Sequence, residues 1–262
     1  MKQFSQVYKS IVSVNASMFF SYRANLFGSL LATSSWTILV IITMLIAVDR
    51  AKSVAGWEQP ELLLLTGTML ILLGLFELHF KRSFQRLSDT IFQGDLDLLL
   101  LKPVDSQFLV TFIHMNFMSI LRLVTGIGFV VYIIVYYQLP ISFASAVGYG
   151  MLLFIGLICY YSIWMMICTI LIWSPRLSNL VEVINSMNHT TRFPPAMYQE
   201  FNTYLFLFLL PYMFIVATPL HALLGEAQMI DYIGLFGSAI VLFTASRMFW
   251  KYALRYYTSA SS

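Results

Sequence analysis

Charged side chains are scarce in this sequence. Only 10% of the 262 residues are Asp, Glu, Lys or Arg, whereas 59% are hydrophobic. A soluble domain carries about 25% charged residues, so the composition excludes an ordinary soluble domain and indicates an integral membrane protein. The net charge of +3 is too small to indicate binding to nucleic acid. We expect a single membrane domain over residues 1–262.

Cysteine is nearly absent, and the groupings that form catalytic or metal sites are missing. Cys159 and Cys168 lie nine residues apart in one apolar segment; a helix places them on opposite faces, so they cannot pair with each other. The four histidines show no metal-ligand spacing. A Gly-x-x-x-x-Gly-Lys-Ser/Thr phosphate loop does not occur. We therefore expect no catalytic residue, metal or cofactor in this chain, and no ATP hydrolysis by it.

Apolar runs are abundant, and they predict an all-α integral membrane fold with six transmembrane helices. A helix needs about 20 apolar residues to cross the bilayer core. Five such spans are predicted directly, at 26–48, 61–80, 108–137, 142–173 and 230–250. Residues 1–25 are too polar to span, but Phe4, Val7 and Ile11 share one helical face. We predict that this segment is an amphipathic helix lying along the membrane interface.

Lysine and arginine gather on one side of the predicted spans. If the N-terminus is inside, the cytoplasmic side collects most of them, and the outside collects only Arg50 and Lys52. Positive loops face the cytoplasm. The bias therefore predicts that both termini, and the stretch 94–103, are cytoplasmic.

The region 177–225 allows two interpretations. Hydropathy alone makes 196–219 the fifth span and leaves 177–195 as an amphipathic cytoplasmic helix. Pro211 and Pro219, however, interrupt that apolar run, and a broken run can be a re-entrant hairpin that dips in from outside. In that case 177–191 is a short, polar fifth span that faces the protein interior.

Polar residues within the predicted spans are candidates for a translocation path. Arg122 falls inside the third span, where a charge is costly and often functional, although it can also simply sit in a polar interior. A second group recurs at three- and four-residue spacings on one helical stripe: Asn179, Glu182, Asn185, Asn188 and His189. The stripe faces water or protein if its helix crosses the membrane, and is an ordinary solvated face if the helix lies on the surface.

A short polar stretch connects the second and third spans. Asp89, Asp95 and Asp97 form the densest acidic cluster among only 12 acidic residues. A helix can run to residue 92, break at Gly94, restart, and end before Pro103. This pattern predicts a short charged helix at the membrane surface, where another protein can push on the spans.

The two aspartates after Gly94 are expected to have different roles, because residues two apart on a helix point in different directions. We expect Asp95 to cap the restarted helix and Asp97 to hold a basic group, such as Lys102 or an arginine of a partner. Leu98 and the leucines after it are expected to face a groove or the membrane edge.

Several motifs resemble those of the six-span permeases of type-2 ABC exporters, in particular a bacterial subgroup of about 260 residues. The stretch 94–103, Gly-Asp-Leu-Asp-Leu-Leu-Leu-Leu-Lys-Pro, is similar to the subgroup's Gly-x-Leu-Asp-x-Leu-Leu-x-x-Pro. The other matching positions are Tyr22, Arg23 and Asn25; Arg192, Phe193, Pro194, Met197 and Tyr198; Pro211; and Pro219, Leu223, Leu224 and Gly225. The subgroup usually has Tyr in place of Phe193, and Ile-Tyr-Pro in place of 197–199.

The resemblance implies a permease subunit of an ATP-driven exporter in the bacterial inner membrane. Two permeases, identical or related, would pair, and each would dock a separate ABC ATPase through the helix between spans two and three. ATP and Mg²⁺ would be bound by those ATPases. The resemblance also favours the re-entrant interpretation of 177–225. Two other classes are an ion-coupled secondary transporter, for which we find no internal repeat or paired intramembrane acids, and an intramembrane enzyme or membrane assembly scaffold.

Overall fold

The computed structural model describes residues 2–21, 23–50, 53–54, 56–174 and 203–257. Within them the chain is almost entirely helical. The long helices are α1 (Lys2–Ser21), α2 (Arg23–Arg50), α3 (Gln59–Phe76), α7 (Ser119–Tyr136), α8 (Phe143–Thr169), α10 (Thr203–Leu224) and α11 (Met229–Leu254). The short elements are strands β1 (Ser53–Val54) and β2 (Trp57–Glu58), a π-helical turn η1 (Glu77–Lys81), α4 (Arg82–Phe92), α5 (Asp95–Leu100), α6 (Ser106–Phe112) and a 3₁₀ turn η2 (Ile170–Ile172).

Five helices in the described residues are long and apolar enough to cross a membrane. They are Phe27–Arg50, Gln59–Phe92, Ser119–Tyr136, Phe143–Ile172 and Met229–Leu254. An all-α membrane protein is therefore confirmed. Within 177–225, the region expected to hold the fifth span, residues 177–202 lie outside the described residues, and α10 covers 203–224.

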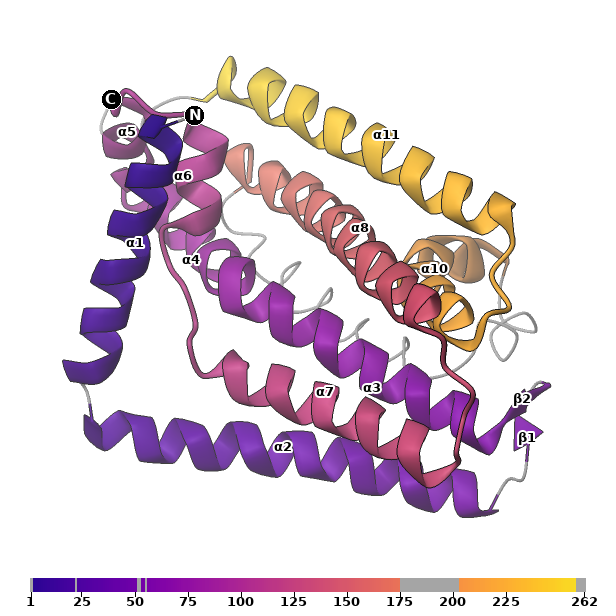
Figure 1. The fold of residues 1–262 in the computed structure, drawn as a ribbon. Coiled ribbons are helices and arrows are strands. Elements are labelled where there is room, and N and C mark those ends of the chain that lie inside the picture. The colour runs from indigo at the N-terminus through magenta and orange to yellow at the C-terminus, as the bar shows by residue number, and fades with distance from the viewer. Residues whose placement is uncertain (1, 22, 51–52, 55, 175–202, 258–262) are drawn as a thin grey trace.

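The helices form a bundle with α3 at its centre, between α7 and α8, while α2 lies beside α7 and α11 beside α8 (Figure 1). α3 is apolar around its whole circumference. In the most apolar 18-residue stretch of its span, 83% of the residues are buried, whereas the corresponding share is 17% for α11 and 22% for α2. α11 also lacks a polar face, yet it is mostly exposed, because in a membrane such a helix can meet either protein or lipid. The central place of α3 is therefore decided by its packing against α7, α8 and α10 and not by its composition.

The bundle has two distinct ends. The hairpin end carries the antiparallel strands β1 and β2, and the connector end carries α1, α4, α5 and α6 (Figure 1). α8 and α11 both run from the hairpin end to the connector end (Figure 1). The chain must therefore return to the hairpin end between Trp173 and Met229. The last part of α10 lies at the hairpin end, since the ring of its His221 is 5.2 Å from the ring of Trp57 in β2.

Glycine lets α3 and α7 approach closely. A Cβ added at Gly74 would lie 2.9 Å from the Leu123 Cα, and one added at Gly126 would lie 3.0 Å from the Ile71 nitrogen. Any side chain at these two positions would push the helices apart. Gly128, also on α7, has no atom within 4 Å of an added Cβ, so it takes no part in this contact.

The predicted third span over 108–137 was wrong as a single helix. The structure divides this region into α6 and α7, with an irregular segment at 113–118 between them. Side chains from elsewhere satisfy the backbone groups that the break exposes. Asn15 of α1 donates to the Ile113 carbonyl at 3.0 Å and accepts from the Met115 N–H at 3.1 Å. Sequence periodicity could not reveal this, because the partner lies about a hundred residues away.

Two further groups form hydrogen bonds with the backbone of the irregular segment 113–118. Ser83 Oγ of α4 donates to the His114 carbonyl at 3.1 Å and accepts from the His114 N–H at 3.0 Å. The Asn116 N–H donates to the Leu78 carbonyl of η1 at 3.0 Å. Burial first, and then the nearby Arg86 and Arg82, lower the pKa of His114 to about 4. This histidine is therefore neutral at pH 7.

Candidate functional site

The connector, residues 82–103 between η1 and α6, has the break and restart that its sequence predicts. α4 ends at Phe92, Gly94 adopts a left-handed φ of +81°, and α5 begins at Asp95. Glycine reaches this φ without the steric cost that a Cβ would add. α5 ends at Leu100, three residues before Pro103. The chain thus makes a sharp turn between two helices at the end of the bundle.

The connector exposes three large apolar side chains. Phe92, Leu98 and Leu101 are 67%, 62% and 81% exposed, whereas Leu96 and Leu99 are buried in the core. Asp95, Lys102 and Pro103 are also exposed and flank this row. We call Phe92, Leu98 and Leu101 the connector patch. Of the leucines expected to face a groove, Leu99 faces the protein's own core.

The expected roles of the two aspartates have different outcomes. Gly94, not Asp95, is the N-cap of α5, and it makes no side-chain capping bond. The capping prediction for Asp95 was wrong, because the left-handed turn places it one residue inside the helix. There its charge still complements the positive end of the short helix. For Asp97, the contact with a basic group stays a prediction. Asp97 is partly buried. Burial is the main cause that raises the pKa of Tyr257, and the nearby Asp97 raises it further.

A cluster of three charged residues lies where α3 passes into η1. Glu77 is 7% exposed and pairs through its two carboxylate oxygens with Lys81 and Arg122, each at 2.6 Å. This places the predicted interior Arg122 in the first turn of α7, against a carboxylate from the neighbouring helix. Two cations around one buried anion leave the cluster with a net positive charge. The pairing partner Glu77 was missed because its 45-residue separation from Arg122 leaves no local pattern.

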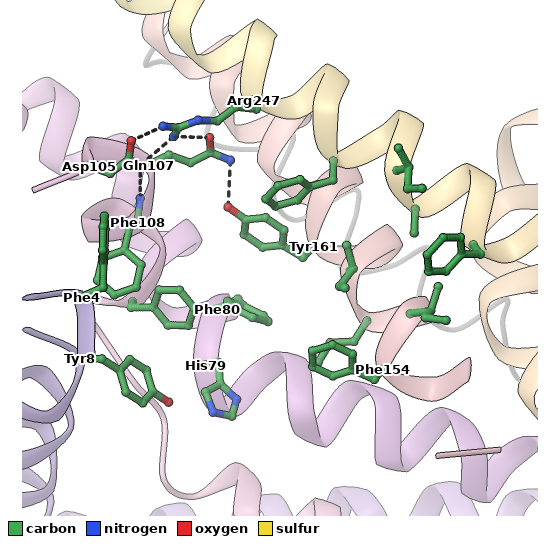
Figure 2. A pocket seen from close by; sticks show the side chains of 18 residues that line it. Phe4, Tyr8, His79, Phe80, Asp105, Gln107, Phe108, Phe154, Tyr161 and Arg247 are labelled. Carbon is green, nitrogen blue, oxygen red and sulfur yellow. Dashed lines mark hydrogen bonds and ion pairs between the residues drawn. The ribbon is translucent and has the colours of Figure 1, made fainter. Parts of the chain in front are cut away.

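A polar network joins the segment after the connector to the last helix. Arg247 of α11 forms a two-pronged ion pair with Asp105 and also donates to Gln107 Oε1 at 3.0 Å. Asp105 in turn caps α6 by accepting from the Phe108 N–H at 3.0 Å. The hydrogen bond from Arg247, above all, holds the pKa of the Asp105 carboxyl below its usual value. Figure 2 shows Asp105, Gln107 and Arg247 together.

The same network reaches α8. Gln107 Nε2 donates to the Tyr161 hydroxyl at 3.0 Å, and that hydroxyl is 3.1 Å from Thr111 Oγ1. Trp250 of α11 donates to Ser106 Oγ at 3.1 Å. Together with the ion pair, these contacts tie α6, the first helix after the connector, to both α8 and α11.

An apolar pocket of about 920 Å³ lies beside this network. Its walls come from α1, η1, α6, α8 and α11, and most of its lining side chains are aromatic or aliphatic. Figure 2 shows Phe4 and Tyr8 on one side, Phe154 on the other, and the Asp105–Arg247 pair at one end. None of the site residues predicted from sequence lines this pocket. Its walls come from five separate segments that only the tertiary structure brings together.

The remaining predicted site residues have the following places. Asn179, Glu182, Asn185, Asn188, His189, Arg192, Phe193, Pro194 and Tyr198 lie outside the described residues. Positions 211 and 219 both fall within α10, so neither proline ends the helix there. Gly225 follows α10 with a φ of +78°, the conformation in which glycine commonly ends helices.

The bundle of apolar helices, with charged helical turns at one end, defines an all-α integral membrane protein. A comparison with family models identifies the particular family. The model described as ABC-2 family transporter protein matches residues 34–261, and the chain belongs to that family. It is thus a membrane permease of the ABC transporter type. No match to an individual curated protein accompanies the family match.

Proposed function

We propose that this chain is the permease subunit of an ATP-driven exporter and that it docks a separate ABC ATPase through α4 and α5. The observation that carries the proposal is the connector patch. Large apolar side chains that are more than half exposed at the charged end of a membrane bundle favour a contact with another protein. The family match supports the same conclusion, since ABC-2 permeases typically work with ATPase partners.

Charge supports a cytoplasmic position for the patch. Lys81, Arg82, Arg86 and Lys102 lie on or beside the connector, and Arg247 joins them from α11. Positive residues mark the cytoplasmic side of a membrane protein. The connector patch then faces the compartment that holds ATP. Both termini are cytoplasmic in this arrangement, because α1 begins and α11 ends at the connector end (Figure 1).

The remaining parts of the proposal follow from the family. Two permeases pair in the bacterial inner membrane, each with its own ATPase, and ATP and Mg²⁺ are bound by the ATPases. Residues 177–225 supply a fifth crossing followed by a re-entrant external segment. Two observations support this crossing: α8 and α11 run in the same direction (Figure 1), and the end of α10 lies beside β2 through His221 and Trp57.

The test replaces the connector patch and measures ATPase recovery. A tagged permease is purified from native membranes, and the ATP-hydrolysing chains that accompany it are identified and quantified by mass spectrometry. The double variant Leu98→Ser with Leu101→Ser is expected to lower this recovery at least tenfold. Loss of two apolar anchors from a docking surface costs about 2 kcal/mol or more.

The matched control removes exposed apolar side chains from the other end of the bundle. Phe143→Ser with Met229→Ser changes residues that are 87% and 76% exposed at the starts of α8 and α11. This variant should retain full ATPase recovery. Equal recovery with both double variants would show that the ATPase does not dock on the connector patch.

A further inference from the structure

The apolar pocket runs lengthwise through one half of the bundle. On α8 its lining extends from Phe154 to Tyr161, and on α11 from Phe236 to Arg247. Eleven helical steps of 1.5 Å give a length of about 16 Å. The pocket therefore begins near the middle of the helices and ends at the connector end, where α1 lies across it (Figure 2).

The pocket has room for an extended hydrocarbon chain. Its volume of about 920 Å³ extends over a length of about 16 Å, and most of its lining side chains are aromatic or aliphatic. A hydrocarbon chain therefore fits lengthwise, along α8 and α11.

The pocket is also open sideways at membrane depth. Its lining side chains Phe154, Phe236, Ile240 and Phe243 are between 47% and 63% exposed. They belong to helices that cross the membrane, so hydrocarbon rather than water is the solvent that reaches them. The two charged residues of the lining, Asp105 and Arg247, lie together at the connector end (Figure 2).

We propose that this pocket binds an acyl chain of a membrane phospholipid from the leaflet at the connector end. The chain lies along α8 and α11, and the head group lies next to the Asp105–Arg247 pair. That pair has no net charge, so it accommodates a zwitterionic head group such as phosphocholine. α1, the amphipathic helix, holds the chain from the other side through Phe4 and Tyr8. The bound lipid thus contacts the residues that directly follow the connector.

The experiment uses a photoactivatable lipid. The purified full-length permease is reconstituted into phosphatidylcholine vesicles that contain a small fraction of phosphatidylcholine with a diazirine in its acyl chain. It is then extracted into detergent, irradiated, and digested for mass spectrometry. Irradiation after extraction reports lipid that stays bound when the bulk membrane is gone. Labelling is expected to concentrate on 154–161 and 236–243.

Two variants on α11 separate the pocket from the general membrane surface. Ile240→Trp fills the pocket, whereas Val241→Trp adds the same bulk at a residue that is 66% exposed and does not line it. Labelling should fall at least fivefold in Ile240→Trp and stay unchanged in Val241→Trp. Equal thermal unfolding of the two variants in detergent confirms that both are folded.

Three results would overturn the proposal. Labelling spread evenly over exposed apolar residues, such as those of α2, would mean ordinary surface lipid. Loss of all labelling on detergent extraction would mean that no lipid is held. Cross-links between 236–243 and a second permease would mean that protein covers this face. Each readout is independent of ATPase docking and of export.

Discussion

At the scale of single residues, the ion pair between Asp105 and Arg247 gives a pH-dependent prediction. Because Arg247 lowers the pKa of the Asp105 carboxyl, the ionised carboxylate stabilises the folded state. This stabilisation is fully present above the unfolded-state pKa of about 3.9 and is lost as the pH falls through the lowered folded value. Asp105→Asn should therefore destabilise the protein by about 1–3 kcal/mol at pH 7.

The measurement compares thermal unfolding of the wild-type protein and Asp105→Asn in detergent across pH. The difference between them should be constant from pH 7 to pH 5 and shrink below about pH 4. Ser142→Ala, which removes the capping hydroxyl at the start of α8, is the control, since its cost does not depend on ionisation. An Asp105→Asn difference that grows on acidification would contradict the assigned pair.

Asn15 is the second residue with a specific consequence. Its side chain satisfies the Ile113 carbonyl and the Met115 N–H, and Asn15→Leu leaves both without that partner. An unmade hydrogen bond at a partly buried backbone group costs about 1–3 kcal/mol. Backbone amides in 113–118 should exchange with deuterium faster in Asn15→Leu. Ser17→Leu, on the exposed side of the same helix, should leave that exchange unchanged; equal protection in all three proteins would argue against the contact.

At the scale of elements, the contact between α3 and α7 depends on glycine. Gly74→Ala would set a Cβ 2.9 Å from the backbone of Leu123, which cannot move without shifting α7. We expect a destabilisation of about 1–3 kcal/mol, typical of overpacking. Gly128→Ala is the matched control, since nothing lies within 4 Å of its added Cβ. It should be neutral or stabilising, by up to about 1 kcal/mol. Chemical unfolding in mixed micelles measures both, and a similar loss at the two positions would contradict the close approach.

At the scale of the whole molecule, the arrangement in the membrane can be read from thiol labelling. Cys159 and Cys168 are buried, so new surface cysteines are reported against a low background. Phe143→Cys at the hairpin end should react with an impermeant maleimide in intact cells, because the proposed orientation places that end outside. Arg255→Cys, an exposed position just after α11 at the connector end, should react only after permeabilisation.

A third position tests the region that the structure does not describe. Gln199→Cys should react in intact cells if residues 192–200 are external, as the re-entrant arrangement predicts. Reaction at Gln199 only after permeabilisation would favour the plain six-span arrangement. Reversed labelling of Phe143→Cys and Arg255→Cys would overturn the orientation itself.

The sequence alone was sufficient for features that depend on local chemistry. Helices α2, α3, α8 and α11 lie where apolar runs predict them, because a span needs only about 20 apolar residues in succession. The turn at Gly94 is also local, since a left-handed φ is a property of one residue. The connector motif led to the family that the family model then confirmed over residues 34–261.

Only the tertiary structure decided the contacts between distant segments. The break between α6 and α7 depends on Asn15 and Ser83, which supply hydrogen bonds that the segment cannot make for itself. Arg122 pairs with Glu77, and Asp105 pairs with Arg247, which lies 142 residues further along the chain. Helical periodicity reports which residues share a face, but not which helix that face meets. The apolar pocket, built from five segments, is for the same physical reason a property of the folded chain alone.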